Sequence, residues 1–251
     1  MKKIKDSNEE YHSHNSISAS GLKTIYKKSV YHHLNSRFKM TDAMNFGSAV
    51  HSAILEDGHD LAVMPEVNLR TKEGKKIKQD FVNDNVGKII IKKEEEEAIE
   101  TIKWNFNNHS LAKSLIQRLT ETEVSYYGEI DNVDVRVRPD GIKENDYIID
   151  IKTSMDASPR YFKSSIYNFA YHLQACFYSE ALGYDPAKFR FITIENKYPY
   201  TVEVFGMSED MIEYGKDAWR IAFDCWKEYL ETNDVGSFWW ENYNKDGSLI
   251  L

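Results

Sequence analysis

Length, composition and charge already narrow the class of protein. The chain has 251 residues, of which 41% are hydrophobic and 13% aromatic, and its formal net charge is -8 at pH 7. This length suits one large domain or two small ones with a packed core. The acidic balance argues against a protein that coats nucleic acid. It does not exclude an enzyme that acts on nucleic acid, because the charge that matters there is local.

Targeting signals and cysteine usage point to a cytoplasmic protein. No apolar run approaches the ~18 residues of a membrane-spanning helix, so we expect no membrane partner. The basic N-terminus, residues 1–6, lacks the apolar region of a secretory signal. Cys176 and Cys225 lie in helical patterns. We therefore expect two reduced, buried thiols and not a disulfide.

The first third of the chain shows helical patterns. Serine residues predict a helix over residues 18–34, and Asp42 is the expected cap of a second helix that ends near residue 56. Residues 64–74 are expected to form a loop. A long polar helix is predicted over residues 92–119, and its run of glutamates suits a helix N-terminus and a solvated face.

The rest of the chain alternates strands and helices. We expect strands over 123–130, 133–139 and 147–152, a helix over 159–182, strands over 189–195 and 201–205, a helix from Ser208 to 231, and a tail with Phe238, Trp239 and Trp240. This order predicts a mixed α/β fold, with a central mixed sheet flanked by helices. We expect one domain over 1–251, with a mainly helical part (1–120), a core of sheet and helices (121–231) and a C-terminal tail (232–251).

Two carboxylates and an ammonium group form the most informative motif. Asp150 and Lys152 are two residues apart on a predicted strand, so their side chains share one face. Asp140 follows the preceding strand, which alternates apolar and charged residues, and we expect the two strands to form a hairpin around a turn at 141–146. Carboxylates gathered in this way bind a hard divalent cation such as Mg2+. An isolated set of this kind is also common on ordinary protein surfaces.

Five further side chains are candidates for the same site. Gln174 and Tyr178 share one face of the predicted helix over 159–182, with Tyr171 a turn earlier. The two tyrosines alone are equally typical of an amphipathic core face. His51 lies in the helix over 42–56, where a histidine is more often a packing residue than a metal ligand. Glu123, at the start of the first strand, either adds a carboxylate to the cluster or is exposed.

Taken together, these motifs resemble the PD-(D/E)xK nuclease superfamily, and more narrowly the RecE-like exonucleases (exodeoxyribonuclease VIII) of phages. The matching segments are spread in order along nearly the whole chain. They are Ser7-Asn8-Glu9-Glu10-Tyr11-His12, Ile17-Ser18-Ala19-Ser20, Phe46-Gly47 through His51 to Glu56, Arg70-Thr71 with Gly74-Lys75, Arg138-Pro139-Asp140, Asp150-Ile151-Lys152-Thr153, and Tyr171-His172-Leu173-Gln174 through Tyr178-Ser179.

The resemblance implies a role for each motif residue. Asp140, Asp150 and the Ile151 carbonyl would bind Mg2+, with Mn2+ as a substitute, and His51 and Glu123 would help to place a second ion. Two such ions about 3.5–4 Å apart clamp a scissile phosphate in two-metal enzymes. Lys152 would be the catalytic lysine, which orients or deprotonates the attacking water. Gln174 and Tyr178 match a Gln-x-x-x-Tyr motif that is also assigned to the catalytic site. Lambda exonuclease has a carboxylate where this chain has His51.

The resemblance also implies a reaction and partners. The expected activity is 5′→3′ degradation of one strand of linear double-stranded DNA, which leaves 3′ single-stranded tails for recombination. The expected partners are duplex ends, a single-strand annealing protein of the RecT or Bet type, and further copies of the chain in a ring. The protein is expected to be encoded by a phage or prophage and to act in the cytoplasm of a bacterial host.

Basic and aromatic residues outside the motif are candidates for DNA contacts. The expected basic loop carries Arg70, Lys72, Lys75 and Lys76. Arg160, Lys163 and Tyr171, just beyond the strand that carries Lys152, are also expected to contact DNA. Phosphate contacts of this kind provide affinity without sequence preference. An exposed charged loop without a ligand is an equally good interpretation of the first group.

Three other functions remain open from the sequence. The same residues would serve a PD-(D/E)xK endonuclease or nickase, which would also cut closed circles. A catalytically inactive DNA-binding protein that assists recombination would have the fold without the activity. A protein-interaction module with an incidental acidic cluster would leave the ordered series of matching segments unexplained.

Overall fold

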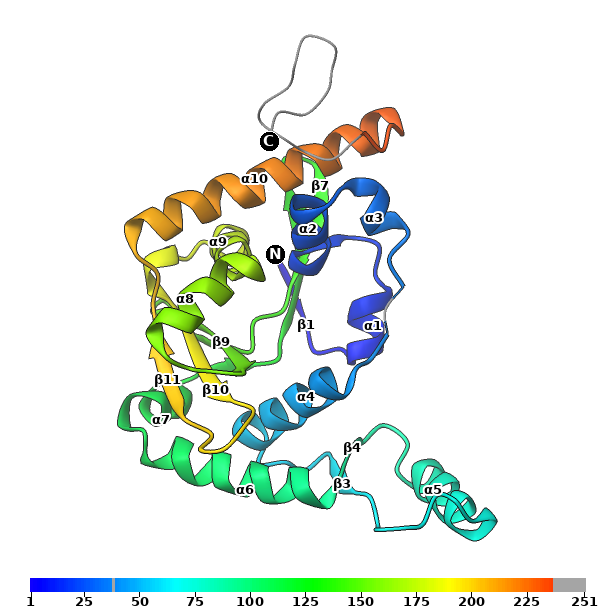
Figure 1. The fold of residues 1–251 in the computed structure, drawn as a ribbon. Helices are drawn as coiled ribbons and strands as arrows, with labels where there is room; N and C mark the ends of the chain where they lie inside the picture. Colours follow the sequence, from blue (N-terminus) through cyan, green and yellow to red (C-terminus); the bar gives the residue numbers. More distant parts are fainter. Residues whose placement is uncertain (38, 237–251) are drawn as a thin grey trace.

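Helices surround a central sheet in the structure, a computed structural model that describes residues 1–37 and 39–236 (Figure 1). The helices are α1 (Asn8–Ser13), α2 (Ala19–Lys27), α3 (Val30–Leu34), α4 (Asp42–Leu55), α5 (Lys72–Asp84), α6 (Lys93–Asn108), α7 (Ser110–Gln117), α8 (Pro159–Asn168), α9 (Tyr171–Leu182) and α10 (Glu209–Thr232). A short 3-10 helix, Pro186–Lys188, precedes β10. The predicted aromatic tail at 238–240 lies outside the described residues.

The central sheet has the strand order β11-β10-β9-β8-β5. Its members are β5 (Glu121–Thr122), β8 (Gly141–Lys143), β9 (Tyr147–Ser154), β10 (Phe189–Glu195) and β11 (Val202–Phe205). Strands β9 and β10 run parallel, whereas the other neighbours are antiparallel. The sheet is therefore mixed, and the predicted α/β fold class is confirmed.

Two smaller sheets complete the fold. One has the order β1-β6-β7-β2, with β1 (Lys2–Ile4), β2 (Ile17–Ser18), β6 (Ser125–Ile130) and β7 (Val133–Val137), and the other pairs β3 (Leu61–Val63) with β4 (Ile89–Ile91). Strands β1 and β2 come from the first part of the chain, and β6 and β7 come from the middle. The N-terminal segment is thus built into the same structure as the later strands.

The central sheet separates two apolar clusters. Ile148 of β9 packs with side chains of α2, α8, α9 and α10, whereas Ile149 and Ile151 pack with side chains of α4, α6 and α7. Alternate residues of a strand point to opposite faces, so Asp150 and Lys152 share the face of Ile148. The strand pattern therefore aims both charged residues toward α9 and α2.

The predicted hairpin between residues 133–138 and 147–152 is wrong. Strand β7 pairs with β6 and β2, and the hairpin partner of β9 is β8, which lies inside the segment that we expected to be a turn. Pro139 lies between the two sheets and has no N–H for a strand ladder, so the chain leaves the first sheet there. Asp140 lies at this crossing.

Three predicted helices are interrupted, and two helices, α1 and α5, were not predicted. The helix over 18–34 divides at Ser29, whose side chain caps α3. The helix over 92–119 divides at His109, whose ring accepts a hydrogen bond from the Ala112 amide. The helix over 159–182 divides at Ala170, which has a left-handed backbone with φ 52°. Helix α5 begins at Lys72, near the end of the loop expected over 64–74, and continues to Asp84.

The capping residue of α4 differs from the prediction. Thr41, and not Asp42, caps α4, and Asp42 is the first helical residue. Cys176 and Cys225 are free thiols, as predicted; the first is buried and the second half-buried. Within the described ranges, no helix has both the length and the apolar character needed to span a membrane.

Candidate active site

Asp150 lies at the centre of a network of charged and amide side chains. Its side chain is 2% exposed, and its Oδ1 accepts a hydrogen bond of 2.6 Å from Nε2 of Gln174 on α9. Its Oδ2 forms an ion pair with the Lys152 ammonium group. The spacing of two residues on β9 thus brings the predicted carboxylate and lysine into direct contact.

Asp140 meets the same strand from the neighbouring sheet. Its Oδ2 accepts a hydrogen bond of 2.5 Å from the backbone N–H of Ile151. Burial raises the pKa of Asp140 to about 7, and the nearby Asp150 and Glu123 carboxylates add to the rise against the opposing effect of His51. Such a shift is typical of a buried carboxyl group that has other carboxylates nearby.

His51, Glu123 and Asp140 form a second group beside Asp150. Nδ1 of His51 lies 3.5 Å from Oδ2 of Asp140 and 3.9 Å from Oε1 of Glu123. Nε2 of His51 lies 3.0 Å from the Ile151 carbonyl oxygen. Burial by itself lowers the pKa of His51, but the Asp140 and Glu123 carboxylates outweigh it and raise this pKa to about 9.

The donor atoms of this second group fit a metal ion. One ligand atom from each of His51, Glu123 and Asp140 lies within 4.8 Å of the others. Two carboxylates and an imidazole are ligands for divalent ions, and carboxylate oxygens are what Mg2+ and Mn2+ prefer. Glu123 lies in the turn between β5 and β6, and not at the start of a strand as predicted.

Helix α9 supplies the amide and aromatic side chains of the site. Tyr171 lies under the Lys152 ammonium group, which is 4.8 Å from the centre of its ring. Tyr178 is buried behind the site, close to Tyr11 and to the backbone of Arg138. Tyr178 therefore contacts the segment that leads to Asp140, whereas Gln174 contacts Asp150.

Two basic residues of the site had no role assigned from the sequence. Lys23 of α2 donates a hydrogen bond of 2.9 Å to Oε1 of Gln174. Burial, and then repulsion by Lys152, lower the pKa of Lys23 to about 7. Nε of Arg138 lies 3.1 Å from Oε2 of Glu123. Arg138 stands in the motif before Asp140, but no local spacing connects Lys23 to residues more than a hundred positions away.

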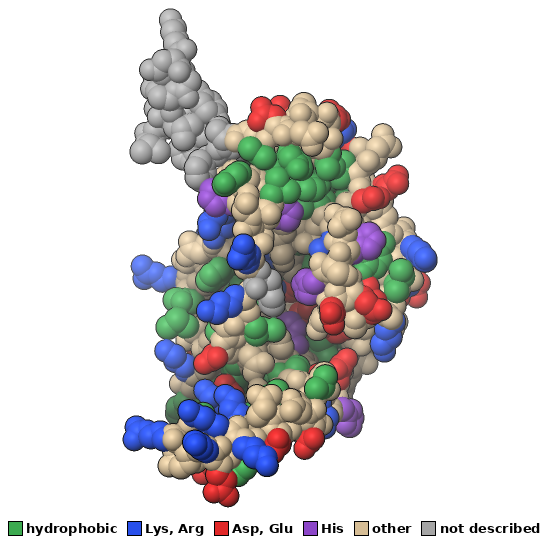
Figure 2. Space-filling view, turned by 90° about the vertical axis from the view of Figure 1, so that its right-hand side faces the viewer, with side chains coloured by type: hydrophobic (Ala, Val, Ile, Leu, Met, Phe, Trp, Pro, Cys, Tyr) green, Lys and Arg blue, Asp and Glu red, His purple; other side chains and the backbone are tan. Residues whose placement is uncertain are grey.

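The predicted basic loop is largely a helix. Lys72, Lys75 and Lys76 lie on α5, and Arg70 precedes it. Helix α5 extends from the body of the molecule, and Lys and Arg side chains gather over it at the lower end of the face in Figure 2. The structure thus separates these four residues from the carboxylate network.

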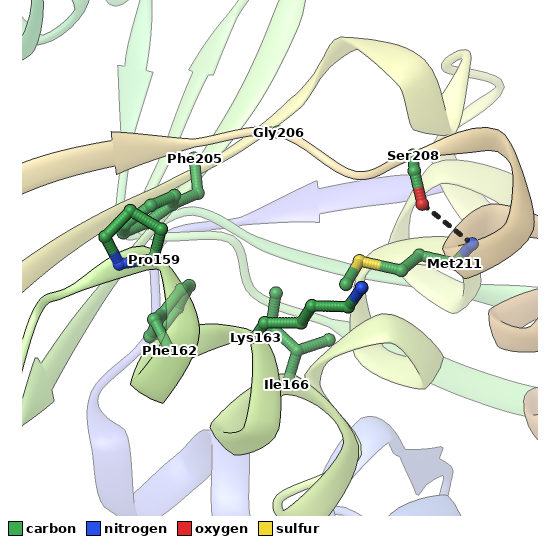
Figure 3. A pocket seen from close by; sticks show the side chains of 8 residues that line it. All are labelled: Pro159, Phe162, Lys163, Ile166, Phe205, Gly206, Ser208 and Met211. Atoms are coloured by element: carbon green, nitrogen blue, oxygen red, sulfur yellow. Dashed lines mark hydrogen bonds between the residues drawn. The ribbon is translucent and has the colours of Figure 1, made fainter.

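Arg160 and Lys163 lie on the exposed side of α8. Lys163 lines a small pocket between α8 and the connection from β11 to α10, with Phe162, Ile166 and Met211 (Figure 3). The carboxylates of the candidate active site do not line this pocket. Because its walls are apolar, we interpret this pocket as a gap in side-chain packing and not as the active site.

Comparisons with known proteins agree with this geometry. Residues 18–233 match the model of a family described as "PDDEXK-like domain of unknown function (DUF3799)". A "Putative exonuclease" from Eubacterium rectale has a similar crystal structure, with a TM-score of 0.61 and 14% identity over 93% of this chain and 89% of that chain. At this identity the likeness concerns the fold alone.

A "phage related exonuclease" from Haemophilus somnus 129PT is a more distant structural match. Its TM-score is 0.35 at 15% identity, over 90% of this chain and 100% of that chain. The search of curated proteins found no match. The family model covers most of the sequence, including every residue of the carboxylate network. The chain therefore belongs to the PDDEXK-like DUF3799 family.

Proposed function

We propose that this protein is a Mg2+-dependent 5′→3′ exodeoxyribonuclease that degrades one strand of linear double-stranded DNA. The observation that carries the proposal is the convergence at β9. Asp150 and Lys152 form an ion pair there, directly beside the group of His51, Glu123 and Asp140. Membership of a PDDEXK-like family supports a nuclease reaction at this site.

The residues that would hold a divalent ion are His51, Glu123, Asp140 and, next to them, Asp150. When bound, the ion supplies Lewis-acid polarisation of the scissile phosphate and favours an ionised attacking water. Because the pKa of His51 is about 9 and that of Asp140 about 7, both residues must release protons before they can act as ligands. Ion binding is therefore expected to strengthen as pH rises.

Lys152 is best suited to stabilise negative charge. Burial alone would lower its pKa, but the carboxylates of Asp150 and Asp140 outweigh burial, so the pKa is raised above its ordinary value. An ammonium group that keeps its proton is a poor base. We assign Lys152 the role of balancing the charge that develops on the phosphate and of orienting the attacking water.

Helix α5 is the proposed contact for the DNA backbone. Lys72, Lys75, Lys76 and Lys78 occupy its N-terminal half and are exposed. The N-terminus of a helix carries a partial positive charge, so lysines there reinforce a field that attracts phosphates. A local positive helix of this kind is compatible with the net charge of -8 for the whole chain.

Strand polarity, products and partners extend the proposal beyond the site. The resemblance to RecE-like exonucleases supports attack from the 5′ end and a 3′ single-stranded tail as product. A ring of subunits would keep the enzyme on its substrate, and the tail would be used by a single-strand annealing protein. These features are part of the proposal and depend on the activity.

The test is digestion of linear duplex DNA labelled at the 5′ or 3′ end, beside a covalently closed circle, with Mg2+. We expect loss of label from 5′ ends, intact circles, and no digestion by Asp150→Ala. Asp134→Ala, which alters an exposed aspartate of β7, is the matched control and should digest normally. Cut circles would show an endonuclease, and no digestion of either substrate would favour a catalytically inactive DNA-binding protein.

A further inference from the structure

Lys23 reaches the candidate active site from a distant part of the sequence. It lies on α2, which packs against α9 and α10. Its ammonium group donates a hydrogen bond of 2.9 Å to Oε1 of Gln174, 151 residues further along the chain. The same group lies 5.7 Å from the centre of the Tyr171 ring, while Lys152 lies 4.8 Å from it. The two lysines thus flank one aromatic ring beside Asp150.

The carboxamide of Gln174 connects Lys23 to Asp150. Its oxygen accepts from Lys23, and its nitrogen donates a hydrogen bond of 2.6 Å to Oδ1 of Asp150. An amide turned by 180° would place its oxygen against the carboxylate and its N–H groups against the lysine. Lys23 therefore reinforces the orientation in which the amide nitrogen, and not the oxygen, faces Asp150.

The orientation of the Gln174 amide determines which carboxylate oxygen of Asp150 faces Lys152. With Oδ1 held by the amide, the other oxygen, Oδ2, is the one in contact with Lys152. A carboxylate held by two fixed partners keeps one orientation, and a reacting group displaced by about 1 Å can cost about 10²-fold in rate. The hydrogen bond from Lys23 thus supports the geometry of a residue that Lys23 does not touch.

A purely structural role would not require a charged residue at this position. The ammonium group of Lys23 is partly buried, near a second ammonium group, and a methionine would fill similar space without the cost of burying a charge. Lys27, one turn later on α2, offers a comparison within the same helix. It is exposed, donates to the Asn168 carbonyl at the end of α8, and contacts the Phe169 ring.

We propose that Lys23 is a positioning residue of the active site, which acts through Gln174 to fix the orientation of Asp150. This inference rests on the proposed nuclease function for its effect on rate. The contact between Lys23 and Gln174 can be tested independently of activity. Lys27→Met is the matched control, because it removes a lysine from the same helix that contacts the α8–α9 junction and not Gln174.

The first readout is the NMR signal of the Gln174 side-chain amide, assigned with Gln174→Met. We expect this signal to shift and broaden in Lys23→Met and to stay in place in Lys27→Met. An unchanged signal in Lys23→Met would overturn the inference whether or not the protein digests DNA.

The second readout is steady-state digestion of linear duplex DNA. We expect Lys23→Met to lower kcat about 10- to 100-fold with KM within about twofold. Lys23→Arg, which keeps the donor, should recover most of the loss, and Lys27→Met should match wild type. Lys23→Met combined with Gln174→Met should be no slower than Gln174→Met alone, because both changes break one connection.

The outcomes separate the two proposals. A wild-type enzyme that digests DNA and a Lys23→Met variant with the same kcat would overturn the positioning role and leave the nuclease function standing. A raised KM with unchanged kcat would also overturn it, in favour of substrate binding by Lys23. A wild-type protein that digests no DNA would overturn the proposed function and the rate effect together, while the NMR signal would still report the contact.

Discussion

The candidate active site and helix α5 place their charges in opposite ways. In the site, carboxylates and ammonium groups lie close together, are largely buried, and contact one another through atoms that come from α2, α4, β9 and α9. On α5, Gly74 is the buried residue, and the lysines are exposed and form no ion pair within the described part of the chain. The charges of the site are held by direct contacts, whereas we propose that the charges of α5 attract DNA through their electrostatic field.

This difference predicts different responses to mutation. A buried charge in a network depends on each partner, so removing one side chain changes the pKa and the orientation of its neighbours. Exposed charges that attract a polyanion each contribute a similar amount to the binding affinity, and salt screens this contribution. Changes in the site are therefore expected to alter kcat, whereas changes on α5 are expected to alter KM and its salt dependence.

Among the lysines, the largest effect on kcat is expected from Lys152. Lys152→Met removes the charge that we propose balances the phosphate, and the loss of one such group typically lowers kcat about 10²- to 10³-fold. Single-turnover digestion at saturating DNA measures this rate directly. Lys216→Met, on the exposed side of α10, is the control and should be unaffected. A Lys152→Met enzyme with the wild-type rate would remove this lysine from the chemistry.

A smaller effect is expected from the α5 lysines. A variant in which glutamine replaces four lysines should raise KM about tenfold or more and leave kcat unchanged. The four are Lys72, Lys75, Lys76 and Lys78. Each lost phosphate contact should lower the slope of log affinity against log salt by about 1. The control carries the same change at Lys93, Lys103, Lys216 and Lys227, which lie on α6 and α10. Equal salt slopes in the two variants would mean that α5 does not contact DNA.

A change of a few degrees in thermal stability is expected from Asp140. Its pKa is raised to about 7 in the folded protein, so between its ordinary value and about 7 the folded state binds more protons than the unfolded state. Stability of the metal-free protein should therefore fall as pH rises through this range. Asp140→Asn should raise Tm at pH 8 and abolish the stabilisation by Mg2+.

The control for this comparison is Asp84→Asn on the exposed end of α5, with Tm measured in EDTA from pH 5 to pH 9. This variant should follow the wild-type profile and should keep its response to Mg2+. An Asp140→Asn variant that is less stable than wild type at pH 8 would show that the buried carboxylate is held by its hydrogen bond with Ile151 and not strained by its neighbours.

The smallest effect is expected from α8. Arg160→Gln and Lys163→Gln should each change KM by about twofold or less, because single exposed charges contribute little and are screened. Binding of a fluorescent duplex at two salt concentrations measures this change. A tenfold loss from either variant would extend the DNA-contacting surface from α5 to α8.

Much of the fold could be predicted where the pattern is local. Three predictions depend only on neighbouring residues, and the structure contains all three. They are the shared strand face of Asp150 and Lys152, the helical spacing of Gln174 and Tyr178, and the strand over 189–195. The family resemblance gave His51 and Glu123, which the structure brings together with Asp140.

The missed features depend on unusual local chemistry or on distant contacts. Helix α5 contains Gly74, and glycine usually indicates a loop. Here the glycine is needed for close packing, because a Cβ at position 74 would lie 2.1 Å from the Asn68 carbonyl oxygen. The break before α9 occurs at Ala170, a residue that rarely adopts a left-handed backbone. Lys23 and Gln174 meet only because α2 packs against α9, and no spacing in the sequence indicates that contact.

The most direct measurement is the release of acid-soluble nucleotides from linear duplex DNA as a function of Mg2+ concentration, for wild type and Asp140→Asn. We predict no release in EDTA, a saturable rise with Mg2+ for wild type, and no release by an Asp140→Asn variant that circular dichroism shows to be folded. Release in EDTA, or an Asp140→Asn variant as active as wild type, would contradict a metal-dependent nuclease centre at β9.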